Sequence, residues 1–303
     1  MKHLLGIEGL SEEEIVSLVD DAVALKEGRP GAGSGQLAGE TWAMIFTKSS
    51  TRTRVSFEVG LNELGARPLF LNANDVQLGR GEPIKDTARV LGRMVHGAII
   101  RTFDQQDVDD FAEYGNISTI NALTDEEHPC QILADLLTIR ELLGGWDGKK
   151  VAFLGDGDCN MGRSWAWAAK RLGFELAIAS PAEFQPADEF MSRLGDAPVT
   201  VSDDAESAAS GADVLYTDTW VSMGKEDEAA DRLKVLAPFQ LNDHLLGLAN
   251  DGAIVQHCLP AYRDKEITES VLESHADEIF QQAENRLHAQ KSILLWLAEN
   301  RST

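Results

Sequence analysis

Seven consecutive residues, Lys48-Ser49-Ser50-Thr51-Arg52-Thr53-Arg54, bring four hydroxyls, two arginines and a lysine together. Hydroxyls, guanidinium groups and the amides of a helix's first turn are the groups that bind oxyanions. An apolar strand-like segment, Thr41 to Phe46, precedes this run, and a helical pattern from about Arg54 to Leu64 follows it. An ordinary Ser/Thr helix cap needs only one hydroxyl, so the crowding favours a site for a phosphorylated ligand.

Polar residues of similar character follow the other predicted strands. In the first half of the chain they are Gln77, Arg101 and the segment His128-Pro129-Cys130-Gln131; in the second half they are segments 156–160, 218–224 and 257–260. Parallel sheets bind ligands at the carboxyl ends of their strands. The first half is rich in anion-binding groups, whereas the second carries Asp218. The pattern therefore suggests a phosphorylated donor that meets a cationic acceptor in a cleft between two units.

Each of these residues also has a structural interpretation. Arg101 could be a surface arginine, although an arginine directly after a buried strand often has a paired or ligand-binding role. His128 could belong to a simple turn, because a proline follows it and proline commonly opens a helix. Gln131 could face solvent on that helix. Asp218 and Ser222 could be turn formers, as Asp and Ser at strand ends usually are.

The cysteines and glycines leave further alternatives. Cys258, beside His257, could be a small buried residue, an activated thiol or a metal ligand. His128, Cys130 and Cys159 would complete a set of candidate ligands, but no pair has the close spacing of a zinc site, so we predict no metal. Segment 155–160 is similar to a dinucleotide loop but lacks the third glycine, so we predict no NAD. Three distant cysteines indicate no disulfide framework.

Composition narrows the class of protein. The chain has 303 residues, is 43% hydrophobic and carries a net charge of −23, with the acidic excess spread along its length. No basic arm is present, which disfavours nucleic-acid binding. No segment approaches the roughly 20 apolar residues of a membrane span, and the apolar start is too short for a secretory signal, so we expect a cytoplasmic protein with no membrane partner. So much negative charge favours a salt-rich cytoplasm, hence a halophilic source.

The order of elements predicts an α/β fold with two doubly wound parallel-sheet domains. A capping box at Ser11 and Glu14 opens a helix that extends to about Lys26. After it, short apolar runs alternate with helical patterns. The expected strands are 42–46, 68–71, 98–102, 117–120, 150–154, 174–179, 199–201, 213–217 and 253–256; the expected helices include 54–64, 84–94, 107–114 and 130–143. The glycine-rich segment 144–148 predicts domains 1–144 and 145–282, with a last helix, about 283–303, that returns to the first domain.

These motifs together resemble the aspartate/ornithine carbamoyltransferase family over nearly the whole chain, and within it the branch that uses ornithine. Segment 50–54 is similar to the family's carbamoyl-phosphate signature and segment 128–131 to its second donor motif, both shared with the branch that uses aspartate. Asp218 with Ser222-Met223-Gly224, and segment 257–260, are similar to the acceptor motifs of the ornithine branch. Segment 284–288 resembles the last donor-binding segment.

The resemblance implies a role for each residue. Ser50, Thr51, Arg52 and Thr53 would hold the phosphate, Arg101, His128 and Gln131 the carbamoyl group, and Arg286 would complete the donor pocket, with Gln77 lent to a neighbouring subunit. Asn160, Asp218, Ser222 and Met223 would bind L-ornithine, and Cys258 and Leu259 would lie where the amine meets the carbamoyl group. The expected catalytic groups are Arg52, Arg101, His128, Asp218 and Cys258. The family uses no metal or organic cofactor and forms trimers or multiples of trimers.

The chemistry of the residues agrees with these roles. In the implied reaction an uncharged δ-amine attacks carbamoyl phosphate, which gives L-citrulline and phosphate as part of arginine metabolism. Arg101, His128 and Thr53 are suitable donors to the carbonyl oxygen as its charge grows. Asp218 and Cys258 are candidates for orienting the amine, and the phosphate is a possible final acceptor of its proton. Aspartate or putrescine as acceptor, and a catalytically silent binding protein, remain alternatives.

The net charge of −23 leads to a prediction about salt. Mobile ions screen the mutual repulsion of surface carboxylates over about 3 Å at molar salt, so dialysis into dilute buffer strengthens that repulsion. We expect the fold to loosen as salt is removed, which circular dichroism and the thermal unfolding midpoint would detect. An unfolding midpoint that does not change between molar and millimolar salt would contradict the prediction.

Overall fold

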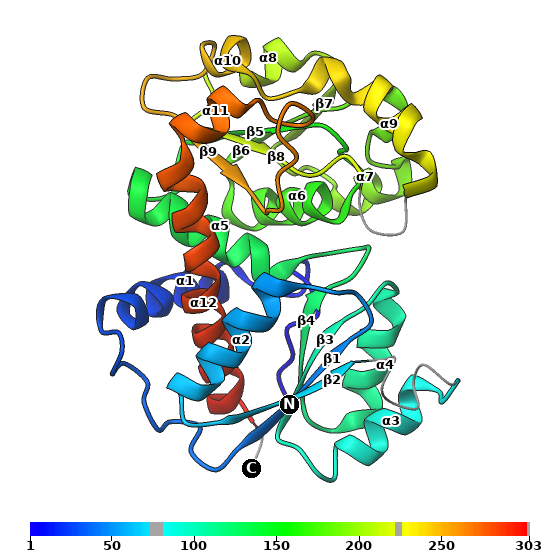
Figure 1. Cartoon of the computed structure of the whole chain (residues 1–303), viewed down its shortest axis with the longest axis vertical. Helices are drawn as coiled ribbons and strands as arrows, with labels where there is room; N and C mark the ends of the chain where they lie inside the picture. Colours follow the sequence, from blue (N-terminus) through cyan, green and yellow to red (C-terminus); the bar gives the residue numbers. More distant parts are fainter. Residues whose placement is uncertain (73–80, 222–225, 302–303) are drawn as a thin grey trace. The chain divides into compact units, whose positions relative to one another are not determined.

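The computed structural model describes residues 1–72, 81–221 and 226–301. Contacts divide the chain into two units, one formed by Met1–Leu137 with Asn285–Thr303 and the other by Thr138–Glu284. The divisions fall inside two helices, α5 (Pro129–Leu143) and α12 (Ala276–Glu299). Each unit contains a parallel sheet, which confirms the predicted fold class (Figure 1). In the described ranges, no helix is both long and apolar enough to cross a membrane.

Unit 1 is built on a parallel sheet with strand order β2-β1-β3-β4 over its described residues. Its strands are β1 (Thr41–Phe46), β2 (Arg67–Asn72), β3 (Gly97–Arg101) and β4 (Ser118–Leu123), and its helices, besides α5 and α12, are α1 (Glu12–Glu27), α2 (Thr51–Glu63), α3 (Ile84–Leu91) and α4 (Gln105–Gly115). The order places β1 between β2 and β3, so the chain returns to the sheet on both sides of its first strand.

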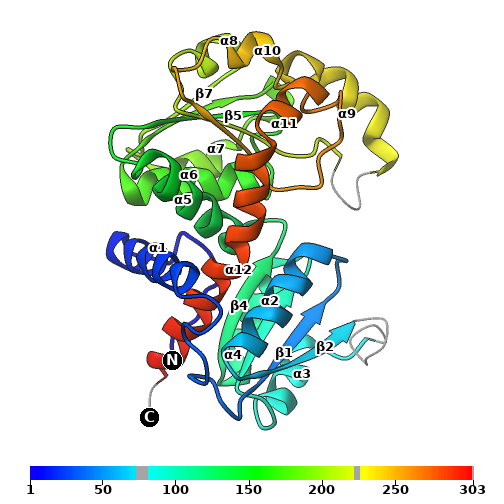
Figure 2. The same ribbon diagram turned by 60° about the vertical axis from the view of Figure 1, so that its left-hand side comes forward.

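Both faces of the unit 1 sheet are covered, as the continuous apolar strands require. Successive side chains of a strand point to opposite faces. Ala43 and Ile45 of β1 belong to a buried cluster with Val108 and Phe111 of α4, whereas the alternate residue Trp42 is buried toward the other face. Figures 1 and 2 show α3 and α4 on one side of the sheet and α1, α2 and α12 on the other.

Unit 2 has a parallel sheet of order β7-β6-β5-β8-β9 over its described residues. Its strands are β5 (Lys150–Leu154), β6 (Glu175–Ala179), β7 (Val199–Ser202), β8 (Val214–Thr217) and β9 (Ile254–His257). Its α-helices are α6 (Asn160–Leu172), α7 (Asp188–Leu194), α8 (Ala205–Ala209), α9 (Ala229–Leu236), α10 (Asp243–Leu246) and α11 (Glu269–Ser274), and its 3-10 turns are η3 (Ala182–Phe184), η4 (Glu226–Glu228) and η5 (Ala237–Phe239).

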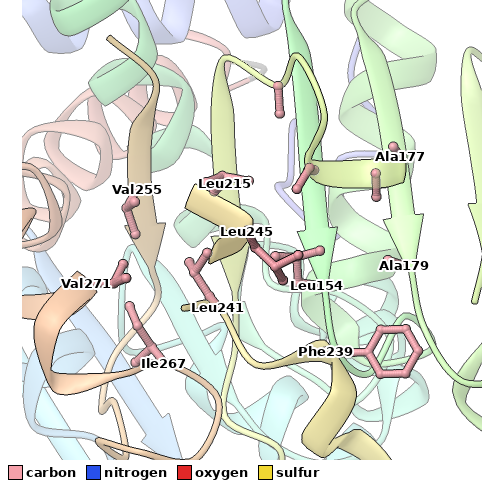
Figure 3. Packing of buried hydrophobic residues seen from close by; sticks show 14 of the residues in the cluster. Leu154, Ala177, Ala179, Leu215, Phe239, Leu241, Leu245, Val255, Ile267 and Val271 are labelled. Atoms are coloured by element: carbon pink, nitrogen blue, oxygen red, sulfur yellow. The ribbon is translucent and has the colours of Figure 1, made fainter. Parts of the chain in front are cut away.

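The two faces of the unit 2 sheet carry different packing. On one face, Leu215 and Val255 pack with Leu241 and Val271 in a hydrophobic cluster that is mostly aliphatic (Figure 3). The alternate residues form an aromatic cluster, where the rings of Phe153 and Tyr216 stack with centroids 5.6 Å apart. Trp165 of α6 meets the Tyr216 ring edge-on at 5.3 Å. Edge-on and offset ring pairs of this kind add to the stability that burial alone provides.

Local signals account for most element boundaries. The capping box of α1 is present, because Ser11 accepts a hydrogen bond from the amide of Glu14 and the Glu14 side chain accepts one from the amide of Ser11. Helix α2 begins at Thr51 rather than near Arg54, because Ser50 caps it. Helix α12 begins at Ala276, earlier than the expected residue 283. Helix α5 ends at Leu143, directly before Gly144 and Gly145, which have positive φ angles of 78° and 139°.

A buried ion pair fastens α12 to α2 within unit 1. The ammonium of Lys291, which is 0% exposed, lies 2.8 Å from Glu63 Oε2. Arg29 donates a second hydrogen bond to the same carboxylate at 2.9 Å. Burial acts to raise the pKa of Glu63, but the hydrogen bonds and charges of Lys291 and Arg29 outweigh it and leave that pKa below its ordinary value. The pair therefore stabilises the fold while Glu63 is ionised.

Removal of this carboxylate should be costly. We predict that Glu63→Ala lowers the free energy of unfolding by about 3 kcal/mol, because it leaves the Lys291 charge buried without its acid. Urea denaturation at pH 7.5 measures the change. The double variant Glu63→Ala/Lys291→Met removes both charges and should recover much of the loss. A single variant as stable as the parent protein would show that the pair contributes nothing.

Candidate active site

The carboxyl ends of β1, β3 and β4 bring the predicted donor-side residues to one edge of the unit 1 sheet. Phe46 at the end of β1 pairs with Arg101 at the end of β3. The amide of Thr47 donates to the Arg101 carbonyl at 2.9 Å, and the amide of Thr102 donates to the Leu123 carbonyl at 3.0 Å. Run 48–54, Arg101 and the segment that leads to α5 therefore all start from the same edge, as the parallel topology requires.

The start of α2 carries the three predicted phosphate-binding hydroxyls, those of Ser50, Thr51 and Thr53. The Ser50 hydroxyl oxygen accepts a hydrogen bond from the amide of Thr53 at 3.2 Å, so Ser50 is a helix cap as well as a candidate ligand. Thr53 is fully buried, and Arg286 Nη2 donates to its hydroxyl oxygen at 2.6 Å. Thr51 is exposed and Arg52 is half-buried in the same first turn. The run and the C-terminal helix α12 thus meet at Thr53.

Positive charge converges on His128, the residue directly before α5. Burial lowers the pKa of His128 well below its ordinary value, and the charges of Arg286 and Arg101 lower it further. All three side chains are buried. The imidazole is therefore neutral at physiological pH and can donate one hydrogen bond to an oxygen. Two guanidinium groups near a neutral histidine make a region suited to an anionic ligand.

Gln131, on the first turn of α5, is oriented by a carboxylate that the sequence analysis missed. Its amide nitrogen donates to Asp135 Oδ1 at 2.8 Å, and both residues are 0% exposed. The Gln131 carbonyl oxygen is thereby left to accept a hydrogen bond, and it accepts none from the described residues. An amide group of a ligand is a suitable donor to it. The spacing of four residues along one helix face is a sequence signal that could have identified Asp135.

Two of the three cations in run 48–54 contact other residues of the protein. The run therefore offers fewer positive charges to an anion than its composition predicted. Lys48 forms an ion pair with Asp125, and its ammonium lies 4.1 Å from the centroid of the Phe103 ring. Arg54 donates to Glu58 at 2.8 Å and lies over the Phe70 ring at 3.8 Å. Because these contacts hold both side chains, counting all three cations of the run overstated its capacity for an anion.

In unit 2, the ends of β8 and β9 bring Asp218 and Cys258 together. The strands pair in register, with Thr217 opposite His257, so the residues that follow them are neighbours. The Cys258 thiol donates to Asp218 Oδ1 at 2.7 Å, and the amide of Thr219 donates to the same oxygen at 2.6 Å. Burial raises the pKa of Asp218. A cationic amine at this carboxylate would compensate for that burial.

The segment after β9 is held by His257, which is 0% exposed. The amide of Leu259 donates to His257 Nδ1 at 2.8 Å. Nδ1 is therefore the acceptor of the ring, and Nε2 carries the proton toward Glu266 Oε1, 3.3 Å away. Leu259 has a φ of +56°, a left-handed conformation that is strained for a bulky residue other than glycine. Glu266 had no signal in the sequence that could have identified it.

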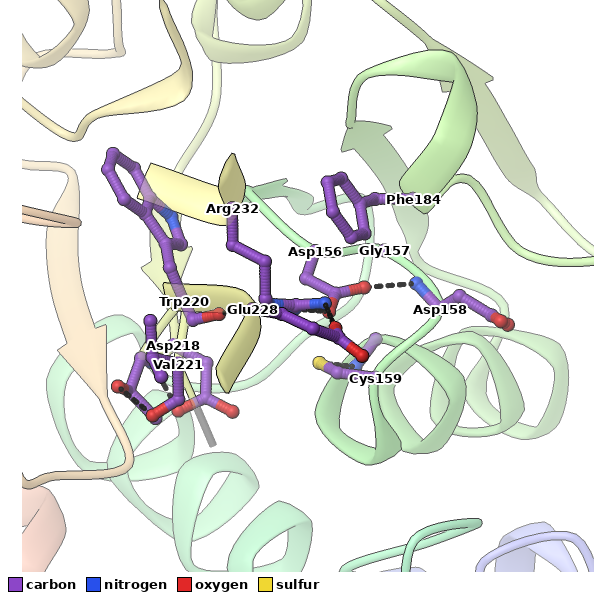
Figure 4. Close-up of polar contacts among 12 residues, drawn as sticks. Asp156, Gly157, Asp158, Cys159, Phe184, Asp218, Trp220, Val221, Glu228 and Arg232 are labelled. Atoms are coloured by element: carbon purple, nitrogen blue, oxygen red, sulfur yellow. Dashed lines mark hydrogen bonds and ion pairs between the residues drawn. The ribbon is translucent and has the colours of Figure 1, made fainter. Parts of the chain in front are cut away.

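The loop after β5 carries Asn160 and is tied to the loop after β8 by Arg232 of α9 (Figure 4). Arg232 pairs with Asp156 and donates from Nε to the Trp220 carbonyl at 2.6 Å. Cys159 caps α6, where its sulfur accepts from the amide of Gly162 at 3.4 Å, and Asn160 is the first residue of that helix. Burial and the charges of Asp156 and Asp218 raise the pKa of Cys159 well above its ordinary value, so this cysteine is a thiol.

Three predicted residues, Gln77, Ser222 and Met223, lie outside the described residues. The other predictions fall into two groups. Ser50, Thr51, Arg52, Thr53, Arg101, His128, Gln131 and Arg286 belong to unit 1, and Asn160, Asp218, Cys258 and Leu259 belong to unit 2. Within each unit the structure brings together residues from several strand ends. The combination can bind an oxyanion in unit 1 and a cationic group in unit 2.

Comparisons with known proteins assign the chain to one family. Residues 2–141 match the aspartate/ornithine carbamoyltransferase carbamoyl-P binding domain, and residues 147–297 match the Asp/Orn binding domain of the same family. The chain is 57% identical over 303 residues to an ornithine carbamoyltransferase from Akkermansia muciniphila, with 99% of each chain covered.

Solved structures give the same result. The fold is similar to that of the anabolic ornithine carbamoyltransferase from Campylobacter jejuni, with a TM-score of 0.94 and 43% identity over 99% of this chain and 100% of that one. It is also similar to the ornithine carbamoyltransferase from Pyrococcus furiosus, with a TM-score of 0.90 and 42% identity over 97% and 96% of the two chains.

The electrostatics of His128 lead to a prediction about pH. Its pKa in the folded protein lies well below the ordinary 6.5, so the unfolded chain binds a proton first as pH falls. His128 therefore leaves stability unaffected above pH 6.5 and lowers it progressively below that pH. Chemical denaturation at pH 7.5 and pH 5.5 should show a larger drop for the parent than for His128→Gln. Equal drops in the two proteins would contradict the lowered pKa.

Proposed function

This chain belongs to the aspartate/ornithine carbamoyltransferase family, and we propose that it transfers the carbamoyl group of carbamoyl phosphate to the δ-amine of L-ornithine. The products are L-citrulline and phosphate. Residues 1–144 with the C-terminal helix bind the donor, and residues 145–282 bind the acceptor. The observation that carries the proposal is the convergence in unit 1 of Thr53, His128 and two buried arginines, which come from four separate elements.

The donor fits the groups of unit 1. Ser50, Thr51, Arg52 and Thr53 at the start of α2 bind the phosphate, where hydroxyls and the positive end of a helix favour an anion. Arg101 and neutral His128 donate to the carbonyl oxygen of the carbamoyl group, and Arg286 completes the pocket. The carbamoyl NH₂ donates to the oriented carbonyl oxygen of Gln131. Donors and acceptors thus match the two ends of carbamoyl phosphate.

The acceptor fits the groups of unit 2. The Asp218 carboxylate attracts the δ-amine, and Asn160, Ser222 and Met223 bind the remainder of L-ornithine. Cys258, whose thiol donates to Asp218, and Leu259 lie where the amine meets the carbamoyl group. The strained backbone at Leu259 supports this assignment, because strain of this kind is concentrated at functional sites.

The reaction proceeds by attack of the uncharged δ-amine on the carbonyl carbon. The new carbon–nitrogen bond forms, the bond from that carbon to the phosphate oxygen breaks, and phosphate leaves with the electron pair. Arg101 and His128 stabilise the charge on the carbonyl oxygen, and Arg52 stabilises the charge that grows on the leaving phosphate. The attacking nitrogen gives up its proton to Asp218 or to the departing phosphate. No metal or organic cofactor takes part.

L-Ornithine is favoured over L-aspartate by the charges of unit 2. An aspartate site needs a basic group for the second carboxylate of that substrate. Arg232, the buried arginine beside the Asp218 loop, is paired with Asp156, whereas Asp218 itself suits an amine. A citrulline-formation assay with carbamoyl phosphate and L-ornithine tests the proposal, with L-aspartate and putrescine as competing acceptors. Carbamoylation of either competitor in preference to L-ornithine would overturn it.

The proposal also covers the oligomeric state of the enzyme, its location in the cell and the salt content of that environment. It acts in arginine metabolism as a cytoplasmic homotrimer or a multiple of trimers, and Gln77 reaches the site of a neighbouring subunit. Its net charge of −23 suits a halophile with a salt-rich cytoplasm. The names of its relatives as ornithine carbamoyltransferases support the activity.

Arg52 and Arg54 offer a matched test. We predict that Arg52→Ala lowers the kcat of citrulline formation about 100- to 1,000-fold, because loss of a charge-assisted contact that strengthens in the transition state costs about 3 to 4 kcal/mol. Arg54→Ala should leave turnover close to that of the parent, since its guanidinium pairs with Glu58 on the surface of α2. Steady-state kinetics measures both, with thermal unfolding as the check of folding. A folded Arg52→Ala variant whose kcat stays within about tenfold of the parent's would overturn the role of this residue.

A further inference from the structure

The N-terminal segment, residues 4–8, is bound to the donor half of the molecule through β4. The amide of Leu4 donates to the Thr119 carbonyl at 2.9 Å, and the Leu4 carbonyl accepts from the amide of Asn121 at 2.7 Å. Leu4 and Ile7 are 0% exposed. The segment therefore forms a short parallel bridge with β4, the edge strand of the sheet. The chain continues from β4 into the turn that leads to His128.

The side chain of Glu127, the residue before His128, makes a second set of hydrogen bonds to the N-terminal segment. The amide of Ile7 donates to Glu127 Oε2 at 2.7 Å in a buried hydrogen bond, and the amide of Glu8 lies 3.4 Å from Oε1. Glu127 is only 7% exposed. A carboxylate is rarely buried unless hydrogen bonds satisfy it, and these two backbone amides contribute to that satisfaction. A side chain on Gly6 would collide with the same carboxylate.

A network of buried and half-buried polar groups continues from this contact to α4, the helix that follows Arg101 in the chain. The amide of Glu127 donates to the Thr124 hydroxyl at 3.2 Å, and that hydroxyl donates to Gln105 Oε1 at 2.8 Å. Gln105 begins α4, and its amide nitrogen donates to the Leu5 carbonyl at 3.2 Å. Asn121 donates to the same carbonyl at 2.9 Å. Residues 4–8 are thus connected by hydrogen bonds both to α4, which follows Arg101, and to the turn that precedes His128.

We propose that Glu127 is a positioning residue for the donor site, because its carboxylate fastens residues 4–8 to the turn that presents His128 and Gln131. This inference rests on the proposed carbamoyl transfer. The turn itself is closed by the amide of Thr124, which donates to the Glu127 carbonyl at 3.0 Å. Without the carboxylate, the turn keeps this bond and its indirect link through Thr124 and Gln105. It loses the direct hydrogen bonds to the amides of Ile7 and Glu8, and the imidazole shifts relative to the donor.

The test compares two glutamates that both fasten the N-terminal region. Glu127→Ala should raise KM for carbamoyl phosphate and lower kcat, together reducing kcat/KM about tenfold to a hundredfold, because small displacements of positioned groups have effects of this size. KM for L-ornithine should stay within about twofold. Glu14→Ala is the control: Glu14 pairs with Lys2 and accepts from the amide of Ser11 at 3.0 Å, and both partners lie outside residues 124–128. Its kinetics should match the parent's.

Two further variants keep the test decisive if Glu127→Ala folds poorly. Glu127→Gln can still accept from the amide of Ile7 and should recover most of the donor affinity. Gly6→Ala keeps Glu127 but displaces its carboxylate, and should raise KM for carbamoyl phosphate as Glu127→Ala does. Calorimetric titration with carbamoyl phosphate reads the effect without turnover, and thermal unfolding reports stability.

The results of these experiments distinguish failure of the Glu127 positioning role from failure of the proposed carbamoyl transfer. If the parent protein forms no citrulline, the proposed function fails. If the parent is active and the Glu127 and Glu14 variants change donor affinity equally, or if Glu127→Ala alters stability alone, the positioning role is overturned. A donor-specific loss in Glu127→Ala and Gly6→Ala, absent from Glu14→Ala, supports it.

Discussion

The hydrogen bond from Arg286 to Thr53 is the contact on which the donor half of this protein depends. It ties the C-terminal helix α12 to the start of α2, across 233 positions of sequence. A guanidinium is effectively always charged and is rarely buried without a partner, so α12 must be held firmly for Arg286 to remain inside. The Lys291–Glu63 pair and the bond from the Ser292 hydroxyl to the Leu18 carbonyl provide that hold.

The donor site reverses the sign of the charge that the whole chain carries. The net charge is −23, yet Arg101 and Arg286 create a local positive potential strong enough to lower the pKa of His128 beyond the effect of burial. Salt screens exposed charges over a few ångström but acts much less on buried ones. High salt would therefore weaken the general repulsion of an anionic donor while the short-range contacts in unit 1 keep their strength. An acidic surface and the proposed phosphate-binding site are compatible for this reason.

In unit 2, the hydrogen-bonded turn after β9 has the organising role that the Arg286–Thr53 contact has in unit 1. His257 accepts from the amide of Leu259 and directs its proton toward Glu266, which holds Leu259 in a left-handed conformation. The same turn aims the Cys258 thiol at Asp218. His257, for which the sequence predicted no role beyond its place beside Cys258 in segment 257–260, thus sets the geometry of the predicted acceptor residues through a hydrogen bond to the backbone.

The sequence by itself determined the two parallel sheets, the strand ends that carry polar residues and the caps of α1, because apolar periodicity and capping are local properties of a few consecutive residues. It also singled out run 48–54, although it could not tell that Lys48 and Arg54 are held by Asp125 and Glu58. Which of several similar charges faces a ligand, how Arg286 reaches Thr53 and how Glu127 engages residues 4–8 were decided only by the tertiary structure. The physical reason is that these contacts join residues far apart in the chain, and their partners are selected by the packing of whole helices and strands.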